Sequence, residues 1–134
     1  RLEIRNAHST RPWQFILDVV FGYLILAVKH KKSTQGAWNF GPDINNIKVK
    51  DLIIILNNLN KNQVKIISKK NHIKESKYLA LNSEKSKKIL GWKPKYNINK
   101  MLSLTSEWYR SLNNYKNLNI ISKKQIKDYL KKLD

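Results

Sequence analysis

The longest apolar stretch of the chain, residues 15–28, most restricts what this sequence can fold into. A helix needs about 20 consecutive apolar residues to cross a membrane, whereas this stretch is shorter and contains a carboxylate, Asp18. We therefore expect no membrane span. Aspartate is a common helix cap, so we predict a mostly buried helix from Asp18 to about Lys29. Residues 13–16 just before it are predicted to form a short strand.

Strands and helices alternate along the rest of the sequence. Apolar spacing and turn residues predict strands at 2–5, 36–40, 64–67 and 78–81, and helices from Lys50, over 83–90, over 98–112 and from about Ser122. Gly91 is placed to end the helix over 83–90 in a left-handed conformation. The alternation is typical of the α/β class, but the strands are too few for a complete doubly wound sheet. We predict one helix-rich α/β unit over residues 1–134.

The helix over 98–112 has the clearest apolar stripe. Its spacing places Met101, Leu102 and Trp108 on the face toward the core, and Asn97 stands where a helix cap is expected. We expect Trp92 to pack close to this helix.

The charge is strongly positive, with 27 Lys and Arg against 9 Asp and Glu, which gives +18. Such a charge is typical of nucleic-acid-binding proteins. Only four of the basic residues are arginine, however, and arginine is the residue that reads bases and phosphates bidentately. The sequence is also rich in Asn and Ile, which A/T-rich codons encode together with Lys. We favour a lysine-rich solvated surface and no nucleic-acid partner, with a nucleic-acid-binding domain as an alternative.

The chain carries no complete catalytic or metal-binding set. It lacks a glycine-rich dinucleotide loop, and His8, His30 and His72 are isolated from one another. Tyr96 and Lys100 match the Tyr-x-x-x-Lys spacing, but they lie at the entry to a helix, and we interpret them as structural. We assign no catalytic, cofactor-binding or metal residue. No leader is recognised after Arg1, and the absence of cysteine fits a cytoplasmic protein.

Arg11 is the strongest candidate for a binding residue. It enters an extended segment, Arg11–Gln14, from a polar loop, and its planar guanidinium can contact two phosphate oxygens at once. An exposed arginine beside a packed Trp13 is the simpler interpretation from composition alone. The polar stretch from Lys69 to Glu75 is a weaker candidate, since most charge runs are solvated loops.

Several segments resemble those of the CDP-glucose 4,6-dehydratases, a branch of the extended short-chain dehydrogenases. Residues 4–14, IRNAHSTRPWQ, are similar to the family's IRNP-x-(A/S)-TRPWQH, and residues 36–42 to its GAWNFGP. Residues 75–82, 86–94 and 107–109 resemble its HEA-x-YLKLD, SKAKKKLGWKP and EWY segments. The matches keep their order along nearly the whole chain. Departures from the family pattern occur at Ala7, Phe15 and Val19, where it has Pro, His and Pro.

This resemblance implies the fold of a C-terminal, substrate-binding portion with an incomplete Rossmann sheet. It implies that residues 1–45 join the dinucleotide-binding part and that residues 46–134 form a small α/β and helical lobe. Arg11 corresponds to an arginine that contacts the substrate diphosphate, and Ile4 and Arg5 correspond to the wall of the base pocket. Many relatives have a second phosphate-binding arginine shortly before Glu75. This chain has none there, and Lys70 or Lys74 is the candidate substitute, as a point charge.

The resemblance also implies an activity and its partners. CDP-glucose would be converted to CDP-4-keto-6-deoxyglucose by an enzyme that binds NAD through a part upstream of the matched region. The complete enzyme would be a cytoplasmic homodimer, and the chain by itself would be inactive. A stand-alone nucleotide-sugar-binding remnant without catalysis is the alternative.

Overall fold

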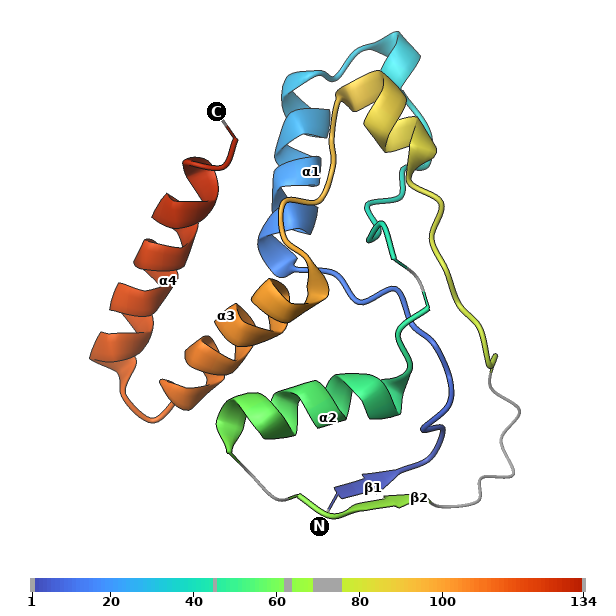
Figure 1. Ribbon diagram of the computed structural model, residues 1–134. Helices are drawn as coiled ribbons and strands as arrows, with labels where there is room; N and C mark the ends of the chain where they lie inside the picture. Colours follow the sequence, from blue (N-terminus) through green and yellow to red (C-terminus); the bar gives the residue numbers. More distant parts are fainter. Residues whose placement is uncertain (1, 45, 62–63, 69–75, 134) are drawn as a thin grey trace.

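Helices dominate the computed structural model, which describes residues 2–44, 46–61, 64–68 and 76–133 (Figure 1). In chain order its elements are β1 (Leu2–Ile4), α1 (Ile16–Val28), the short 3-10 helix η1 (Lys32–Thr34), α2 (Val49–Asn60), β2 (Ile66–Ser68), the π-helical turn η2 (Ser86–Leu90), α3 (Ile98–Arg110) and α4 (Tyr115–Leu130). The predicted helix-rich α/β class with an incomplete sheet is confirmed.

The sheet consists of β1 and β2, which pair in parallel with Leu2 opposite Ile66 and Ile4 opposite Ser68. Both strands were predicted from the sequence. The strands predicted at 13–16, 36–40 and 78–81 are wrong, because among the described residues none of these segments pairs with a neighbouring strand beyond an isolated bridge. A strand forms only when it pairs with a neighbouring strand, and the sequence pattern of one segment does not reveal that neighbour.

Helix α1 contacts η2, and the other helices of the described part pack in sequence. Helix α2 packs against α3, and a tight turn at 111–114 sends α4 back along α3 toward α1 (Figure 1). Asn97 caps α3 as predicted, since its side chain accepts a hydrogen bond from the Lys100 backbone N–H at 3.0 Å. Gly91 ends η2 with φ 70°, also as predicted. Helix α4 begins seven residues before the predicted start at Ser122.

The hydrophobic core of the described residues has two clusters. The first cluster has five buried members, namely Phe15, Leu52, Met101, Leu102 and Tyr129. The second cluster contains Phe40, Leu90 and Trp92. Met101 and Leu102 therefore lie in the core as predicted, whereas Trp108 is only half-buried and donates its indole N–H to Ser122. The first cluster joins residues from both sides of the predicted boundary at residue 45.

A buried carboxylate connects these clusters. Asp18 is completely inaccessible to solvent, and it is not the helix cap that the sequence predicted, because α1 begins two residues earlier. Its Oδ1 accepts hydrogen bonds from the Lys95 backbone N–H at 2.9 Å and the Tyr129 hydroxyl at 2.8 Å, and its Oδ2 accepts one from Gln14 at 2.9 Å. Its backbone carbonyl accepts the Trp92 indole N–H at 2.8 Å.

Burial raises the pKa of the Asp18 carboxyl above its ordinary value of 3.8, and the hydrogen bonds from Lys95, Tyr129 and Gln14 oppose that rise. The raised pKa means that the folded state holds the carboxyl proton more tightly than the unfolded state. The resulting stabilisation is complete below the unfolded pKa and is lost as pH rises through the folded pKa.

Asp18→Asn should therefore remove a pH-dependent part of the free energy of unfolding. The amide is neutral at every pH and keeps an acceptor for Lys95 and Tyr129, while Gln14 can rotate to present its oxygen. Urea unfolding from about pH 4 to about pH 7 should show the wild type losing stability relative to Asp18→Asn as pH rises. The exposed Glu84→Gln is the matched control, and an equal trend there would contradict a special role for Asp18.

Gly22 in the middle of α1 gives a second stability prediction. A Cβ built on Gly22 would lie 2.5 Å from the ring of Phe40, which is itself packed edge-on against Trp92. Gly22→Ala should thus destabilise the chain by about 1–3 kcal/mol through overpacking, although alanine is the better helix former. At the exposed Ala27 of the same helix, Ala27→Gly should cost about 1 kcal/mol. Thermal unfolding measures both, and a Gly22→Ala variant more stable than wild type would contradict the close packing.

Candidate functional site

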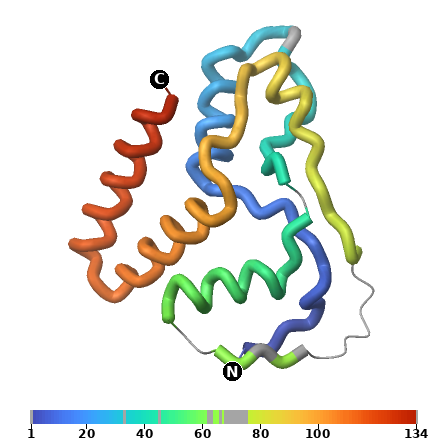
Figure 2. The backbone as a smooth tube through the Cα atoms, viewed as in Figure 1, coloured from blue at the N-terminus to red at the C-terminus, as the bar shows by residue number. Residues whose placement is uncertain are grey.

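The candidate site begins with the segment before α1, which lies between two other parts of the chain (Figure 2). Thr10 forms an antiparallel bridge with Lys48 and a parallel bridge with Tyr78. Its backbone N–H donates to the Lys77 carbonyl at 2.9 Å, and on the other side the Val49 N–H donates to the Ser9 carbonyl at 3.0 Å. The segment is therefore fixed from both sides immediately before Arg11.

Arg11 lies where these segments meet. Its side chain is half-buried, and its Nη1 donates to the Thr10 carbonyl at 2.7 Å and to the Ser76 carbonyl at 3.1 Å. These bonds fix the direction of the guanidinium and attach it to the segment that begins at Ser76. The sequence motif predicts Arg11 as a binding residue, but it does not predict that Arg11 lies beside Ser76.

Only some of the other residues predicted to contact the substrate lie within the described part of the chain. Ile4 is buried at the end of β1, with 8% of its surface exposed, and Arg5 is exposed directly after it. Lys74 and Glu75 lie outside the described residues. The assignment of all five residues to substrate binding stays a prediction.

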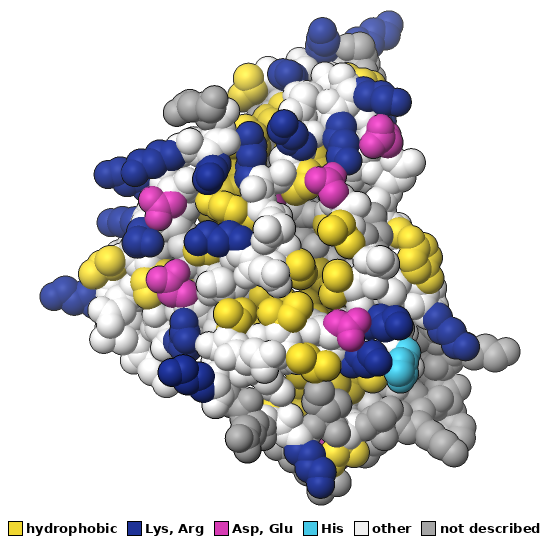
Figure 3. Space-filling view, viewed as in Figure 1, with side chains coloured by type: hydrophobic (Ala, Val, Ile, Leu, Met, Phe, Trp, Pro, Cys, Tyr) yellow, Lys and Arg dark blue, Asp and Glu magenta, His cyan; other side chains and the backbone are white. Residues whose placement is uncertain are grey.

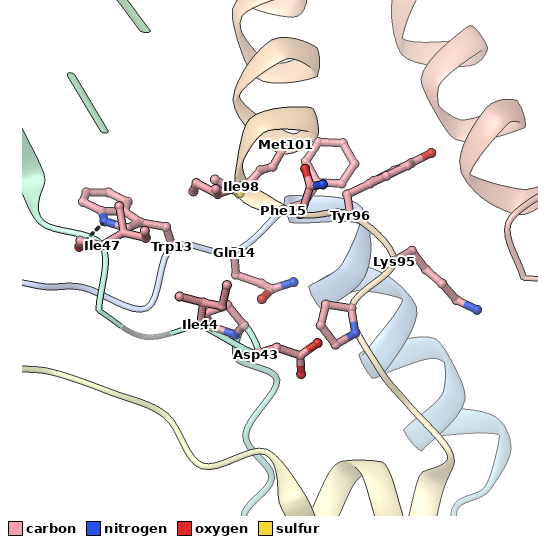
Figure 4. Close-up of a pocket in the computed structure, with 13 residues that line it drawn as sticks. Trp13, Gln14, Phe15, Asp43, Ile44, Ile47, Lys95, Tyr96, Ile98 and Met101 are labelled. Atoms are coloured by element: carbon pink, nitrogen blue, oxygen red, sulfur yellow. Dashed lines mark hydrogen bonds between the residues drawn. The ribbon is translucent and has the colours of Figure 1, made fainter. Parts of the chain in front are cut away.

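A cavity of about 220 Å³ lies beside this segment (Figure 4). Its walls come from residues 13–15, from Pro42, Asp43, Ile44 and Ile47, and from residues 94–98 together with Met101. Trp13 is held at its edge by an indole N–H bond to the Ile47 carbonyl at 3.1 Å. Figure 4 shows the Gln14 side chain projecting into the space between the Ile44 and Lys95 segments.

Among the residues that the structure describes, two buried polar atoms near Arg11 have no hydrogen-bond partner. They are Thr10 Oγ1 and Gln14 Oε1, and both are shut off from solvent. Buried polar groups are nearly always paired, so such atoms are unusual. Gln14 lines the cavity while its Nε2 is bound to Asp18, which leaves an acceptor beside aromatic walls. The cavity suits a small group with apolar faces.

The contributions of Asp43, Gln14 and Tyr96 to this cavity were not predicted from the sequence. Tyr96 packs edge-on against Phe15 and Tyr129, and burial raises the pKa of its hydroxyl. These contacts agree with the structural interpretation of the Tyr-x-x-x-Lys match. Asp18 carried a recognisable signal, since it is the one charged residue in an apolar stretch, but its partners lie 77 and 111 positions downstream.

The distribution of charged side chains and of possible metal ligands indicates which other kinds of site the described part of the chain could carry. Figure 3 shows Lys and Arg side chains spread around one face of the molecule, with Asp and Glu among them, rather than gathered into one basic patch. Within the described ranges, no group of three His, Cys, Asp or Glu residues could hold a metal ion. No helix in the described part of the chain is long and apolar enough to cross a membrane.

Comparisons with known proteins agree with the predicted resemblance and with the fold. The CDP-glucose 4,6-dehydratase of Salmonella typhimurium is 31% identical to this chain, over 95% of this chain and 37% of its own length. No protein-family model matches the chain.

Two solved structures have a similar fold. The structure of RMD from Pseudomonas aeruginosa, complexed with NADPH, has a TM-score of 0.67 and 21% identity, over 77% of this chain and 33% of that chain. The Bordetella bronchiseptica enzyme WbmF, in complex with NAD+ and UDP, has a TM-score of 0.61 and 20% identity, over 93% of this chain and 35% of that chain.

This chain thus spans only about a third of the length of each relative. The predicted resemblance is confirmed: the chain is similar to a CDP-glucose 4,6-dehydratase over nearly its whole length, and it has the fold of the C-terminal portion of an extended short-chain dehydrogenase.

Proposed function

We propose that this chain supplies the nucleotide-sugar-binding portion of a sugar-nucleotide 4,6-dehydratase, a lyase, whose substrate is CDP-glucose. The observation that carries the proposal is the similarity to a CDP-glucose 4,6-dehydratase along 95% of the chain, in a segment where Arg11 is held at a junction of three chain segments. Enzymes of many different activities share this fold, so the proposed activity rests on the sequence similarity.

Arg11 is the proposed diphosphate ligand. A guanidinium presents five N–H donors in a fixed plane and matches two phosphate oxygens at once, which an ammonium group does not. Its bonds to the Thr10 and Ser76 carbonyls engage Nη1 and reduce the rotamer freedom that a bound ligand would otherwise have to restrict. Ile4 and Arg5 are proposed near the base, and Lys74 and Glu75 near the phosphates and sugar.

We assign NAD binding to a part of the enzyme outside this chain. A dinucleotide cradle needs several glycines in one turn between a strand and a helix. The chain has four glycines in total, and they do not fit this requirement: Gly22 lies inside α1, Gly91 ends η2, and Gly36 and Gly41 stand apart. The proposed complete enzyme is a cytoplasmic homodimer.

The first functional prediction concerns Arg11. Arg11→Lys keeps the charge but loses the two-pronged contact, so CDP and CDP-glucose should bind about ten- to a hundredfold more weakly, a loss of about 1.5–3 kcal/mol. Arg11→Ala should weaken binding at least as much. The measurement is calorimetric titration of CDP at one fixed salt concentration.

Two distal lysines serve as matched controls. Lys123 and Lys131 lie on or just after α4, and changing either to Ala should leave CDP affinity nearly unchanged. Equal losses at these lysines and at Arg11 would favour diffuse electrostatic binding, whose affinity falls steeply between about 50 and 200 mM salt. Unchanged affinity in Arg11→Ala would contradict the diphosphate assignment.

The second functional prediction concerns catalysis. Residues 1–134 alone should neither retain NAD nor form a 4-keto-6-deoxy sugar nucleotide, because they contain no dinucleotide cradle. Incubation with CDP-glucose and NAD, followed by chromatography of the sugar nucleotides, tests this. Detection of the keto product would contradict the proposal that NAD is bound by a part of the enzyme outside this chain.

A further inference from the structure

Arg11, Pro12 and Trp13 form a tight three-residue turn. The Trp13 backbone N–H donates to the Arg11 carbonyl at 2.9 Å, which is the i to i+2 hydrogen bond of a γ-turn. Proline fixes φ near about −65°, close to the value of about −75° that the central residue of an inverse γ-turn adopts. Pro12 therefore suits the centre of this turn, and the turn keeps Trp13 close to the backbone of Arg11.

Both ends of this turn bind the same backbone carbonyl, that of Ile47. The Arg11 N–H donates to it at 3.4 Å, and the Trp13 indole N–H donates to it at 3.1 Å. Protein N–H···O bonds are normally about 2.7–3.2 Å long, so the Arg11 bond alone is a weak one. The indole therefore makes the stronger of the two bonds that hold the Ile47 carbonyl beside Arg11.

The Ile47 carbonyl matters to Arg11 because it belongs to the antiparallel bridge at Thr10. One backbone bond of that bridge runs from the Val49 N–H to the Ser9 carbonyl and is 3.0 Å long. The other is the longer bond from Arg11 to Ile47. The bridge is thus looser on the side of Arg11, and this is the side that the indole of Trp13 reinforces.

We propose that Trp13 is a positioning residue for Arg11. Its indole N–H holds the Ile47 carbonyl, and that carbonyl fixes the Arg11 backbone. The guanidinium then extends from a fixed backbone to the carbonyls of Thr10 and Ser76. A side chain that is already ordered loses less conformational entropy when a ligand binds to it. The inference rests on the proposed function, which makes Arg11 the diphosphate ligand.

Trp13→Phe tests the role of the indole N–H, because it removes that donor and keeps an aromatic ring to pack against the first core cluster. With one hydrogen bond lost, the chain should bind CDP about two- to tenfold more weakly in calorimetric titration at one fixed salt concentration. Trp38→Phe is the matched control. Trp38 is also half-buried, and its indole N–H donates to the Thr34 carbonyl at 2.8 Å, so this change should leave CDP affinity unaltered.

Two further measurements separate positioning from a general loss of stability. In an Arg11→Ala background, Trp13→Phe should weaken CDP binding no further, since a residue that acts through Arg11 has no effect without it. With Arg11 intact and no nucleotide present, Trp13→Phe should speed hydrogen exchange of the Arg11 backbone amide about two- to tenfold, whereas Trp38→Phe should not change it.

Three outcomes would overturn the inference: unchanged CDP affinity in Trp13→Phe, an equal loss in Trp38→Phe, or an undiminished loss in the Arg11→Ala background. Pro12→Ala is a second variant, because it loosens the same turn without altering the Trp13 ring. It should also weaken CDP binding, and wild-type affinity there would likewise contradict the inference. If Arg11→Ala itself binds CDP as tightly as wild type, the proposed function fails, and the exchange rate of the Arg11 amide still decides whether Trp13 holds Arg11 in place.

Discussion

The buried carboxylate of Asp18 restricts how α1, the loop before α3 and the end of α4 can be arranged relative to one another. A carboxylate without solvent is tolerated only when donors surround it, since an unpaired buried charge costs several kcal/mol. Its donors come from the extended segment before α1, from the loop before α3 and from the end of α4. Because the Asp18 backbone also accepts the Trp92 indole, one residue sets the position of both core clusters.

The fold could be predicted from the sequence where it depends on residues that are close together along the chain. Asn97 and Gly91 marked the helix ends correctly, because capping depends on side chains and backbone angles within a few positions. The predicted strands at 13–16 and 36–40 failed for the opposite reason, since pairing depends on segments far along the chain. Asp18 was read as a cap because its type and position suit one, whereas its side chain is directed to donors that no local pattern reveals.

The candidate site also contains some residues that could be predicted from the sequence and others that could not. Arg11 could be singled out from a short motif, and its neighbours in sequence, Trp13 and Gln14, line the cavity beside it. Asp43 and Tyr96 could not be found, because they reach that cavity from segments 30 and more residues away. Sequence resemblance supplied the hypothesis that Arg11 binds a diphosphate, and the structure added which parts of the chain hold Arg11 in place.

The bond between Tyr129 and Asp18 has a consequence for the order in which the molecule can form during synthesis. The two residues are 111 positions apart, so a growing chain displays α1 long before the hydroxyl that satisfies its carboxylate has been made. Segments emerge from the ribosome at about 5–20 residues per second, which leaves an interval of several seconds between the two residues. During that interval the apolar side chains of α1 are exposed without the later segments that pack on them, and such exposed apolar surface makes a nascent chain prone to aggregation.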